Sequence, residues 1–244
     1  MLKIRILSYT KNPLTTIGER AAVCYNTKLK DSEHAKRIGM SVLKDGHGRN
    51  LEFPKIDFVI EEGCSARMER ELYTHIGGAP TRVQSSTRYI TYKDFSYYTP
   101  NNLTNEQRLV YEKIMEDISN GYGKLKDLGC ENDITGYVLP LALEQKMVWS
   151  GNARTLENLF NQRLCKRALK EFQDFAKELK KQISELDEEW KWIADNLYVP
   201  KCVKQLGICF EARGCGLFPK YKDFKPYLDE AHRKYREDNK LDNE

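Results

Sequence analysis

The stretch Trp149–Arg163 places the strongest constraint on how this chain can fold. Its residues read as a helix entering a core, yet they include two arginines, three asparagines and a glutamine. Polar side chains cost free energy when they are buried without hydrogen-bond partners. The segment is therefore either a solvated helix face or the lining of a site for a polar, anionic ligand. These alternatives imply different kinds of protein.

Helical geometry separates the polar residues of this region into two faces. We expect a helix over 154–167, and at 100° per residue its apolar stripe contains two arginines, whereas other polar residues lie opposite. An arginine on an apolar stripe is usually paired or reaches into a cavity. Its planar fork of donors suits phosphate or a pyrimidine carbonyl, and a structural ion pair is the alternative. The stripe comprises Leu156, Leu159, Phe160, Arg163 and Arg167, and the opposite face Arg154, Asn158, Asn161 and Cys165.

A second polar segment, 75–89, is rich in glycine, serine and threonine and contains Arg82 and Arg88. Glycine allows the backbone to approach a ligand closely, and hydroxyl and amide groups supply neutral donors. The segment lacks both the lysine-containing end of a P-loop and the spacing of a dinucleotide fingerprint. Its composition suits a phosphate cradle, and a polar loop before a strand is the alternative.

Composition limits the remaining possibilities. The 244 residues carry a net charge of only +4, and nucleic-acid binding would require a clustered basic face. No apolar run reaches the roughly 18 residues of a membrane span. The seven cysteines and the lack of a secretory signal favour reduced thiols in the cytoplasm. Cys202, Cys209 and Cys215 lack the close pair typical of zinc sites, so we expect a compact loop and no metal there.

The distribution of elements indicates an α+β fold, because strands are few, helices are many and no regular βαβ alternation is present. We expect one domain over 1–228, with a C-terminal extension from about 199 and a charged tail over 229–244. Gly77–Pro80 should end a helix, and 46–50 should form a turn. We predict strands at 3–8, 56–61 and 88–92 and helices at 17–25, 31–45, 65–75, 104–120, 139–149, 154–167 and 171–195.

Six short motifs occur in a fixed order along the chain. They are Ala22–Asn26, Gly46–Glu52, Arg70–His75, Gln84–Tyr89, Val138–Pro140 and Ser150–Thr155. This set of motifs resembles that of the flavin-dependent thymidylate synthase (ThyX) family. The match extends over most of the chain, and six motifs in order are far more specific than one. Residues 202–217 also resemble a cysteine- and glycine-containing tail found in some members.

The resemblance implies an α+β fold with a small antiparallel sheet and a surrounding helical bundle. It implies a homotetramer with active sites between subunits, and no binding to membranes or nucleic acids. The expected reaction is the reductive methylation of dUMP at C5. Methylenetetrahydrofolate would supply the carbon, reduced FAD the hydride and NADPH the electrons for the flavin, without a cysteine nucleophile.

The resemblance also assigns roles to residues. Arg163 would contact the uracil ring and favour its enolate form, as electrostatic catalysis requires. The other nucleotide contacts would be Ser86, the backbone of Thr87, Arg88, Glu71 and Arg82. The FAD contacts would be Asn152, Arg154, Asn158, Gln162 and Arg167, with His75, Gln84 and Glu52 as further candidates.

Several positions depart from the family pattern. Thr74 and Ile76 flank His75 where the family has arginines, and Arg82 is a candidate replacement. Gly136 stands in for another arginine, and Phe53 and Arg167 for histidines. Three alternatives therefore stay open: a homologue that modifies C5 of another pyrimidine nucleotide, for example by hydroxymethylation, a non-catalytic nucleotide- or flavin-binding homologue, and a nucleic-acid-binding protein.

Overall fold

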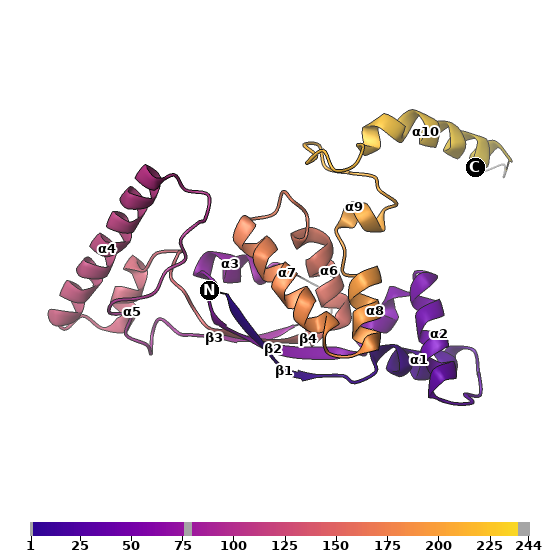
Figure 1. Cartoon of the computed structure of the whole chain (residues 1–244), viewed down its shortest axis with the longest axis horizontal. Helices are drawn as coiled ribbons and strands as arrows, with labels where there is room; N and C mark the ends of the chain where they lie inside the picture. The colour runs from indigo at the N-terminus through magenta and orange to yellow at the C-terminus, as the bar shows by residue number, and fades with distance from the viewer. Residues whose placement is uncertain (1, 76–79, 239–244) are drawn as a thin grey trace.

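A computed structural model describes residues 2–75 and 80–238. The described residues form a four-stranded antiparallel sheet in the order β1-β2-β4-β3. In Figure 1, α3, α6 and α7 lie on one side of this sheet, and α4 stands apart from it. This arrangement confirms the predicted α+β class. The strands are β1 (Lys3–Tyr9), β2 (Lys55–Glu62), β3 (Thr81–Gln84) and β4 (Met147–Asn152).

The helices occupy most of the chain. Those before β4 are α1 (Pro13–Cys24), α2 (Ser32–Lys44), the short 3-10 helix η1 (Gly48–Glu52), α3 (Ala66–Leu72), α4 (Asn105–Asp127), α5 (Asn132–Thr135) and the short 3-10 helix η2 (Gly136–Val138). Those after it are α6 (Ala153–Arg163), α7 (Lys170–Ser184), α8 (Glu188–Asn196), α9 (Lys201–Lys204) and α10 (Tyr221–Asp238).

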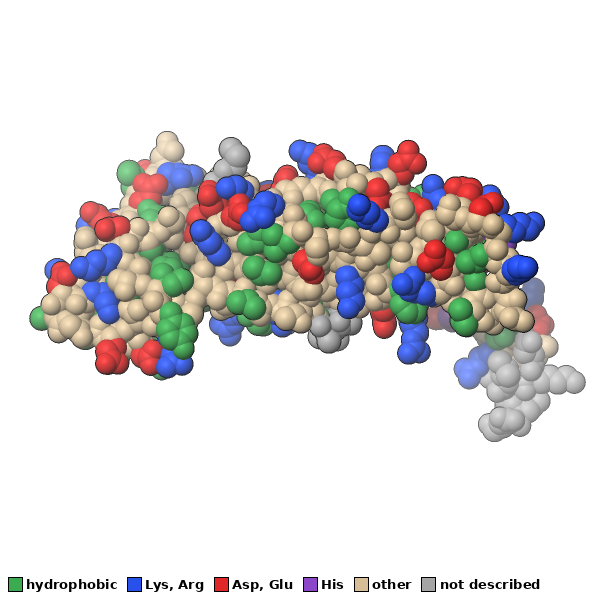
Figure 2. All heavy atoms as spheres, turned by 90° about the horizontal axis from the view of Figure 1, so that it is seen from below, with side chains coloured by type: hydrophobic (Ala, Val, Ile, Leu, Met, Phe, Trp, Pro, Cys, Tyr) green, Lys and Arg blue, Asp and Glu red, His purple; other side chains and the backbone are tan. Residues whose placement is uncertain are grey.

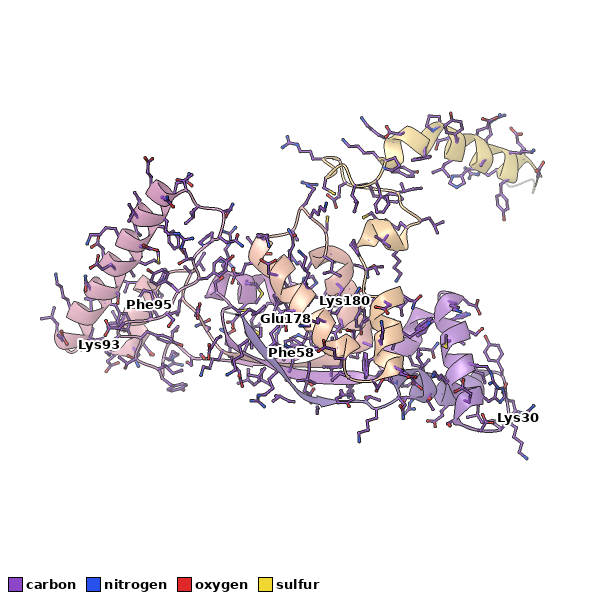
Figure 3. The ribbon with its side chains drawn as sticks, viewed as in Figure 1. Lys30, Phe58, Lys93, Phe95, Glu178 and Lys180 are labelled. Atoms are coloured by element: carbon purple, nitrogen blue, oxygen red, sulfur yellow. The ribbon has the colours of Figure 1, made fainter. Side chains whose placement is uncertain are left out.

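The core lies between the sheet and the helices that cover one of its faces. Alternation along β2 directs Ile56, Phe58 and Ile60 into this core, and all three are fully buried. Phe58, labelled in Figure 3, stacks on Trp149 of β4 with 5.0 Å between ring centroids. Phe175 of α7 closes the layer, 6.0 Å from the Phe58 ring. The sheet thus provides a rigid base for the helices that carry the predicted site.

The other face of the sheet is open. Val59 of β2 pairs with Val148 of β4, which also pairs with Val83 of β3, so a row of valines crosses the strands. Val83 and Val148 are exposed. Figure 2 views the molecule from the side on which the sheet lies, and hydrophobic side chains stand there among charged ones.

Two predicted elements are wrong in type. Residues 88–92 form a turn followed by irregular chain rather than a strand, because Ser86 accepts a backbone bond from Ile90 and the Tyr92 N–H donates to the Tyr122 hydroxyl. The strand next to β4 is instead β3. The predicted helix 139–149 is also wrong: a loop with Pro140 leads into β4. A short apolar run such as 147–149 does not distinguish a strand from a helix.

Other elements differ in their boundaries. The helix predicted over 104–120 extends to Asp127, with the expected capping box at Thr104 and Gln107. The single helix predicted over 171–195 is two helices, because Asp187 caps a new one by accepting a bond from the Trp190 N–H. The turn predicted at 46–50 contains part of η1. The tail predicted from Asp229 is helical as far as Asp238, and the helix end predicted at Gly77–Pro80 lies largely outside the described residues.

The crossing of α1 and α2 provides a test of packing. A Cβ added to Gly18 would lie 1.7 Å from the Ala35 carbonyl oxygen, whereas one added to Gly121 of α4 would meet nothing within 4 Å. We expect Gly18→Ala to lower the free energy of unfolding by about 2 kcal/mol or more through overpacking. The same substitution at Gly121 should raise it by about 0.5–1 kcal/mol, because alanine favours a helix. Urea unfolding followed by circular dichroism measures both, and a Gly18→Ala protein as stable as wild type would contradict the close crossing.

Candidate functional site

Helix α6 carries most of the predicted site, and its start is fixed by the sheet. Asn152 ends β4 and caps α6, because its side-chain oxygen accepts bonds from the Thr155 N–H at 3.0 Å and the Thr155 hydroxyl at 3.1 Å. An asparagine cap of this kind is worth about 1 kcal/mol. Leu156, Leu159 and Phe160 are fully buried, as the apolar stripe predicts. The helix ends at Arg163, so the prediction of a helix to 167 is wrong, and Arg167 lies in the following turn.

Arg163 lies where three elements meet. Its Nε donates to His75 Nε2 at 2.8 Å, and its Nη1 donates to Glu71 Oε2 at 2.9 Å. The guanidinium carbon lies 4.5 Å from the centre of the Phe172 ring of α7, a cation–π distance. The arginine on the apolar stripe is therefore both paired and directed towards the end of α3. The contacts within the chain hold it in one position.

His75 must be neutral to accept the bond from Arg163. The side chain is buried, and burial together with the Arg163 charge lowers the pKa of His75 from 6.5 to about 4. Its ring also meets Phe172 edge to face, with 5.6 Å between centroids. At neutral pH the pair therefore carries one positive charge, and that charge is on Arg163.

Arg163 also lines a cavity of about 770 Å³. One wall comes from α6 and the turn after it, and the opposite wall comes from the C-terminal extension. The α6 wall includes four predicted site residues: Asn158, Gln162, Arg163 and Arg167. The extension wall includes Lys201, Lys204, Phe210, Glu211 and Phe218.

Arg154 lies near the start of α6 and is paired. Its Nη1 donates to Glu157 Oε2 at 2.6 Å, and Lys204 of α9 bonds the other oxygen of the same carboxylate. The Glu157 side chain is only 3 % exposed, so two cations offset its burial. Arg154 also approaches η1 closely, since a Cβ on Gly48 would lie 2.3 Å from its Nη1. Glu52, at the end of η1, is exposed.

The predicted phosphate-binding residues lie on a separate turn after β3. The Arg88 backbone N–H donates to Ser86 Oγ at 3.2 Å, and Thr87 sits against Gly136, where a Cβ would lie 3.4 Å from its hydroxyl. The Arg88 guanidinium forms a two-bond pair with Asp133, at 3.0 and 3.2 Å. Both side chains are exposed, so this pair contributes little to stability and can be exchanged for a ligand.

Residues of β3 pack against the end of α3. Arg82 donates to the Leu72 carbonyl at 3.3 Å, and its guanidinium carbon lies 3.7 Å from the centre of the Tyr73 ring. The Tyr73 hydroxyl donates to Gln84 at 2.7 Å. Arg82 therefore lies beside the end of α3, close in sequence to Thr74.

Sequence reasoning missed two residues that organise this region. Glu157 follows Arg154 by three positions, a spacing that allows contact on a helix, and this signal was available. Lys204 is 47 positions from Glu157, and no local pattern predicts their contact. Within the described residues, no group of three or more His, Cys, Asp or Glu side chains is arranged to hold a metal ion, and no helix could cross a membrane.

Comparison with known families decides the relationship. The family described as "Thymidylate synthase complementing protein" matches residues 5–187 of this chain. The chain belongs to this family. The match covers the sheet, α6 and α7, and it ends before the C-terminal extension.

Flavin-dependent thymidylate synthases of other organisms are similar to most of the chain. The flavin-dependent thymidylate synthase of Clostridium tetani is 28% identical, with 88% of this chain and 93% of the relative covered. That of Thermococcus onnurineus is 29% identical, with 86% and 89% covered. A crystal structure of thymidylate synthase X (ThyX) from Helicobacter pylori with FAD and dUMP has a TM-score of 0.65 at 21% identity. It covers 80% of this chain and 99% of its own, which confirms the fold expected from the motifs.

Proposed function

We propose that this protein is a flavin-dependent thymidylate synthase that converts dUMP to dTMP. The observation that carries the proposal is the position of Arg163, which donates to both Glu71 and His75 and also lines a cavity with other basic and amide side chains. The family match and the names of the relatives support the same activity. Methylenetetrahydrofolate is the proposed carbon donor, and NADPH the proposed reductant of the flavin.

The cavity residues fit FAD, the ligand named with the Helicobacter pylori structure. Asn158 and Gln162 offer amide groups, whereas Arg163 and Arg167 offer positive charge, and Phe210 adds an aromatic surface. Such a lining suits an anionic, partly aromatic dinucleotide. We propose Asn152, Arg154, Asn158, Gln162 and Arg167 as its contacts, with His75, Gln84 and Glu52 as further candidates. Reduced FAD supplies a hydride when it is bound.

The turn after β3 is the proposed site for the dUMP phosphate. Ser86 and Arg88 lie on this turn with the Thr87 backbone between them, and the Arg88 side chain can leave Asp133 at little cost because both groups are exposed. Glu71 and Arg82 are proposed as additional nucleotide contacts. The phosphate would be held by a hydroxyl and a forked guanidinium, which suit its oxygens.

Arg163 is the proposed catalytic residue. Its fixed positive charge would stabilise the negative charge that develops on a uracil carbonyl oxygen when C5 acts as the nucleophile. His75 keeps the guanidinium in place without adding a second charge, because its lowered pKa of about 4 leaves it neutral at pH 7. Glu71 accepts a bond from Nη1 of Arg163 and so orients the same guanidinium group.

We propose that the protein forms a homotetramer in the cytoplasm, with sites between subunits. Exposed apolar side chains support association. They occur on the open face of the sheet, at Val83 and Val148, and along α4, at Leu109, Val110 and Ile114. α4 buries only Met115 and Tyr122 among its described residues, so most of this long helix is available to a partner.

Two measurements test the function. We expect the purified protein to be yellow, or to take up added FAD, and to release tritium from dUMP labelled at C5 when methylenetetrahydrofolate and a reductant are present. A protein that binds no FAD would refute the enzyme proposal. Release from another pyrimidine nucleotide but not from dUMP would instead favour a homologue with a different substrate, as the replacements at Thr74 and Gly136 allow.

A further inference from the structure

The C-terminal extension forms the second wall of the cavity that α6 also lines. In Figure 1, α9 leads away from α8, and α10 stands clear of the main body. None of the described residues of α10 is buried. The extension therefore contributes little to the core, although residues 201–218 supply more than half of the residues that line the cavity.

Two ion pairs attach this wall to α6 and the turn after it. Lys204 bonds the buried carboxylate of Glu157, which also holds Arg154. Arg167 donates to Glu211 at 2.7 Å. The first pair lies near the middle of α6 and the second lies beyond its end, so the extension is joined at two places to the segment that carries the proposed FAD contacts.

The charge of the cavity lining favours an anion. Its cationic side chains are Arg163, Arg167, Lys201 and Lys204, whereas Glu211 is its acidic one. Lys201 is exposed and makes no ion pair with any residue in the described part of the chain. Its charge therefore stays available to a ligand, in contrast to that of Lys204.

We propose that the C-terminal extension is a built-in part of the cofactor site and that Lys201 binds the diphosphate of FAD. This inference rests on the proposed function. Lys204 acts differently: it is a positioning residue that holds the wall in place through Glu157, which also orients Arg154. The family match ends at residue 187, so this part of the site lies outside the matched region.

Charge reversal at Lys201 tests the proposal. We expect Lys201→Glu to weaken FAD binding about tenfold or more, because a charge-assisted contact becomes a repulsive one. Lys222→Glu makes the same charge change on α10, outside the cavity lining, and should leave the dissociation constant within about twofold of wild type. Quenching of flavin fluorescence measures binding without turnover, and repetition at higher salt should reduce the difference between the two variants.

The outcomes separate the two proposals. Wild-type protein that binds FAD, with Lys201→Glu binding it equally well, would overturn the role of the extension and leave the thymidylate synthase proposal standing. Wild-type protein that binds no FAD would overturn both. Circular dichroism melting of each variant checks that the fold is kept, and protection of residues 201–218 from proteolysis on addition of FAD is the second expected result. Unchanged cleavage there would contradict it.

Discussion

Arg163→Ala should reduce dTMP formation by about a hundredfold or more while the protein stays folded. A preorganised donor that stabilises developing charge is commonly worth about 10²–10³ in turnover. The substitution removes the guanidinium that His75 and Glu71 hold in place and leaves the buried stripe of α6 unchanged. Tritium release from C5-labelled dUMP measures the loss, and thermal unfolding measures the fold.

Two controls accompany this experiment. Arg163→Lys keeps the positive charge but loses the planar set of guanidinium donors, so we expect its turnover to lie between those of Arg163→Ala and wild type. Arg233→Ala removes an exposed arginine of α10 that pairs with Glu237, and its turnover should match wild type. Turnover by Arg163→Ala at the wild-type rate would refute the catalytic role.

The second large effect concerns stability. Glu69 of α3 is 1 % exposed, and neither of its carboxylate oxygens has a hydrogen-bond partner in the described part of the protein. Burial, with the charge of Glu171 added, raises the pKa of Glu69 from 4.5 to about 8. We expect Glu69→Gln to raise the free energy of unfolding by about 3 kcal/mol at pH 7, since the neutral amide needs no proton on folding.

The sign of the pH dependence follows from the direction of this shift. Between pH 4.5 and 8 the unfolded chain has released the proton of Glu69 while the folded protein retains it. The contribution of Glu69 to the free energy of unfolding is therefore fully present below pH 4.5 and is lost as the pH rises towards 8. The gain from Glu69→Gln should shrink towards zero near pH 4.5. Urea unfolding at pH 5 and pH 7 measures the trend, with exposed Glu116→Gln as the control, and a gain that is equal at both pH values would contradict it.

Local patterns predicted the parts of the fold that local forces determine. The apolar stripe of α6 was visible because Leu156 and Phe160 recur at helical spacing, and both are buried. The capping box was also visible in the sequence, because Thr104 and Gln107 are only three residues apart. The strand predicted at 88–92 failed because tertiary contacts decide such segments: its backbone bonds go to Ser86 and Tyr122 rather than to a neighbouring strand.

The candidate site was predictable in composition but not in its connections. Helical spacing brought out Arg163, and the structure adds its partners, Glu71 and His75, which are about 90 positions away in the chain. Arg167 was placed on the same stripe, yet α6 ends at Arg163, and Arg167 pairs with Glu211 instead. Long-range ion pairs of this kind depend on the assembled fold, which no short window of sequence contains. The assigned roles of these residues stay predictions.

The hydrophobic core contains no described residue beyond Tyr198. Apart from Lys204, which pairs with the buried Glu157 carboxylate, residues 201–218 can therefore change in length or sequence without disturbing the packing of this core. Ligand affinity and thermodynamic stability are then separable traits, and mutation can alter one with little penalty to the other. A scaffold of this design allows natural variation, or deliberate engineering, to act on the mouth of the cavity while the sheet and α6 stay constant.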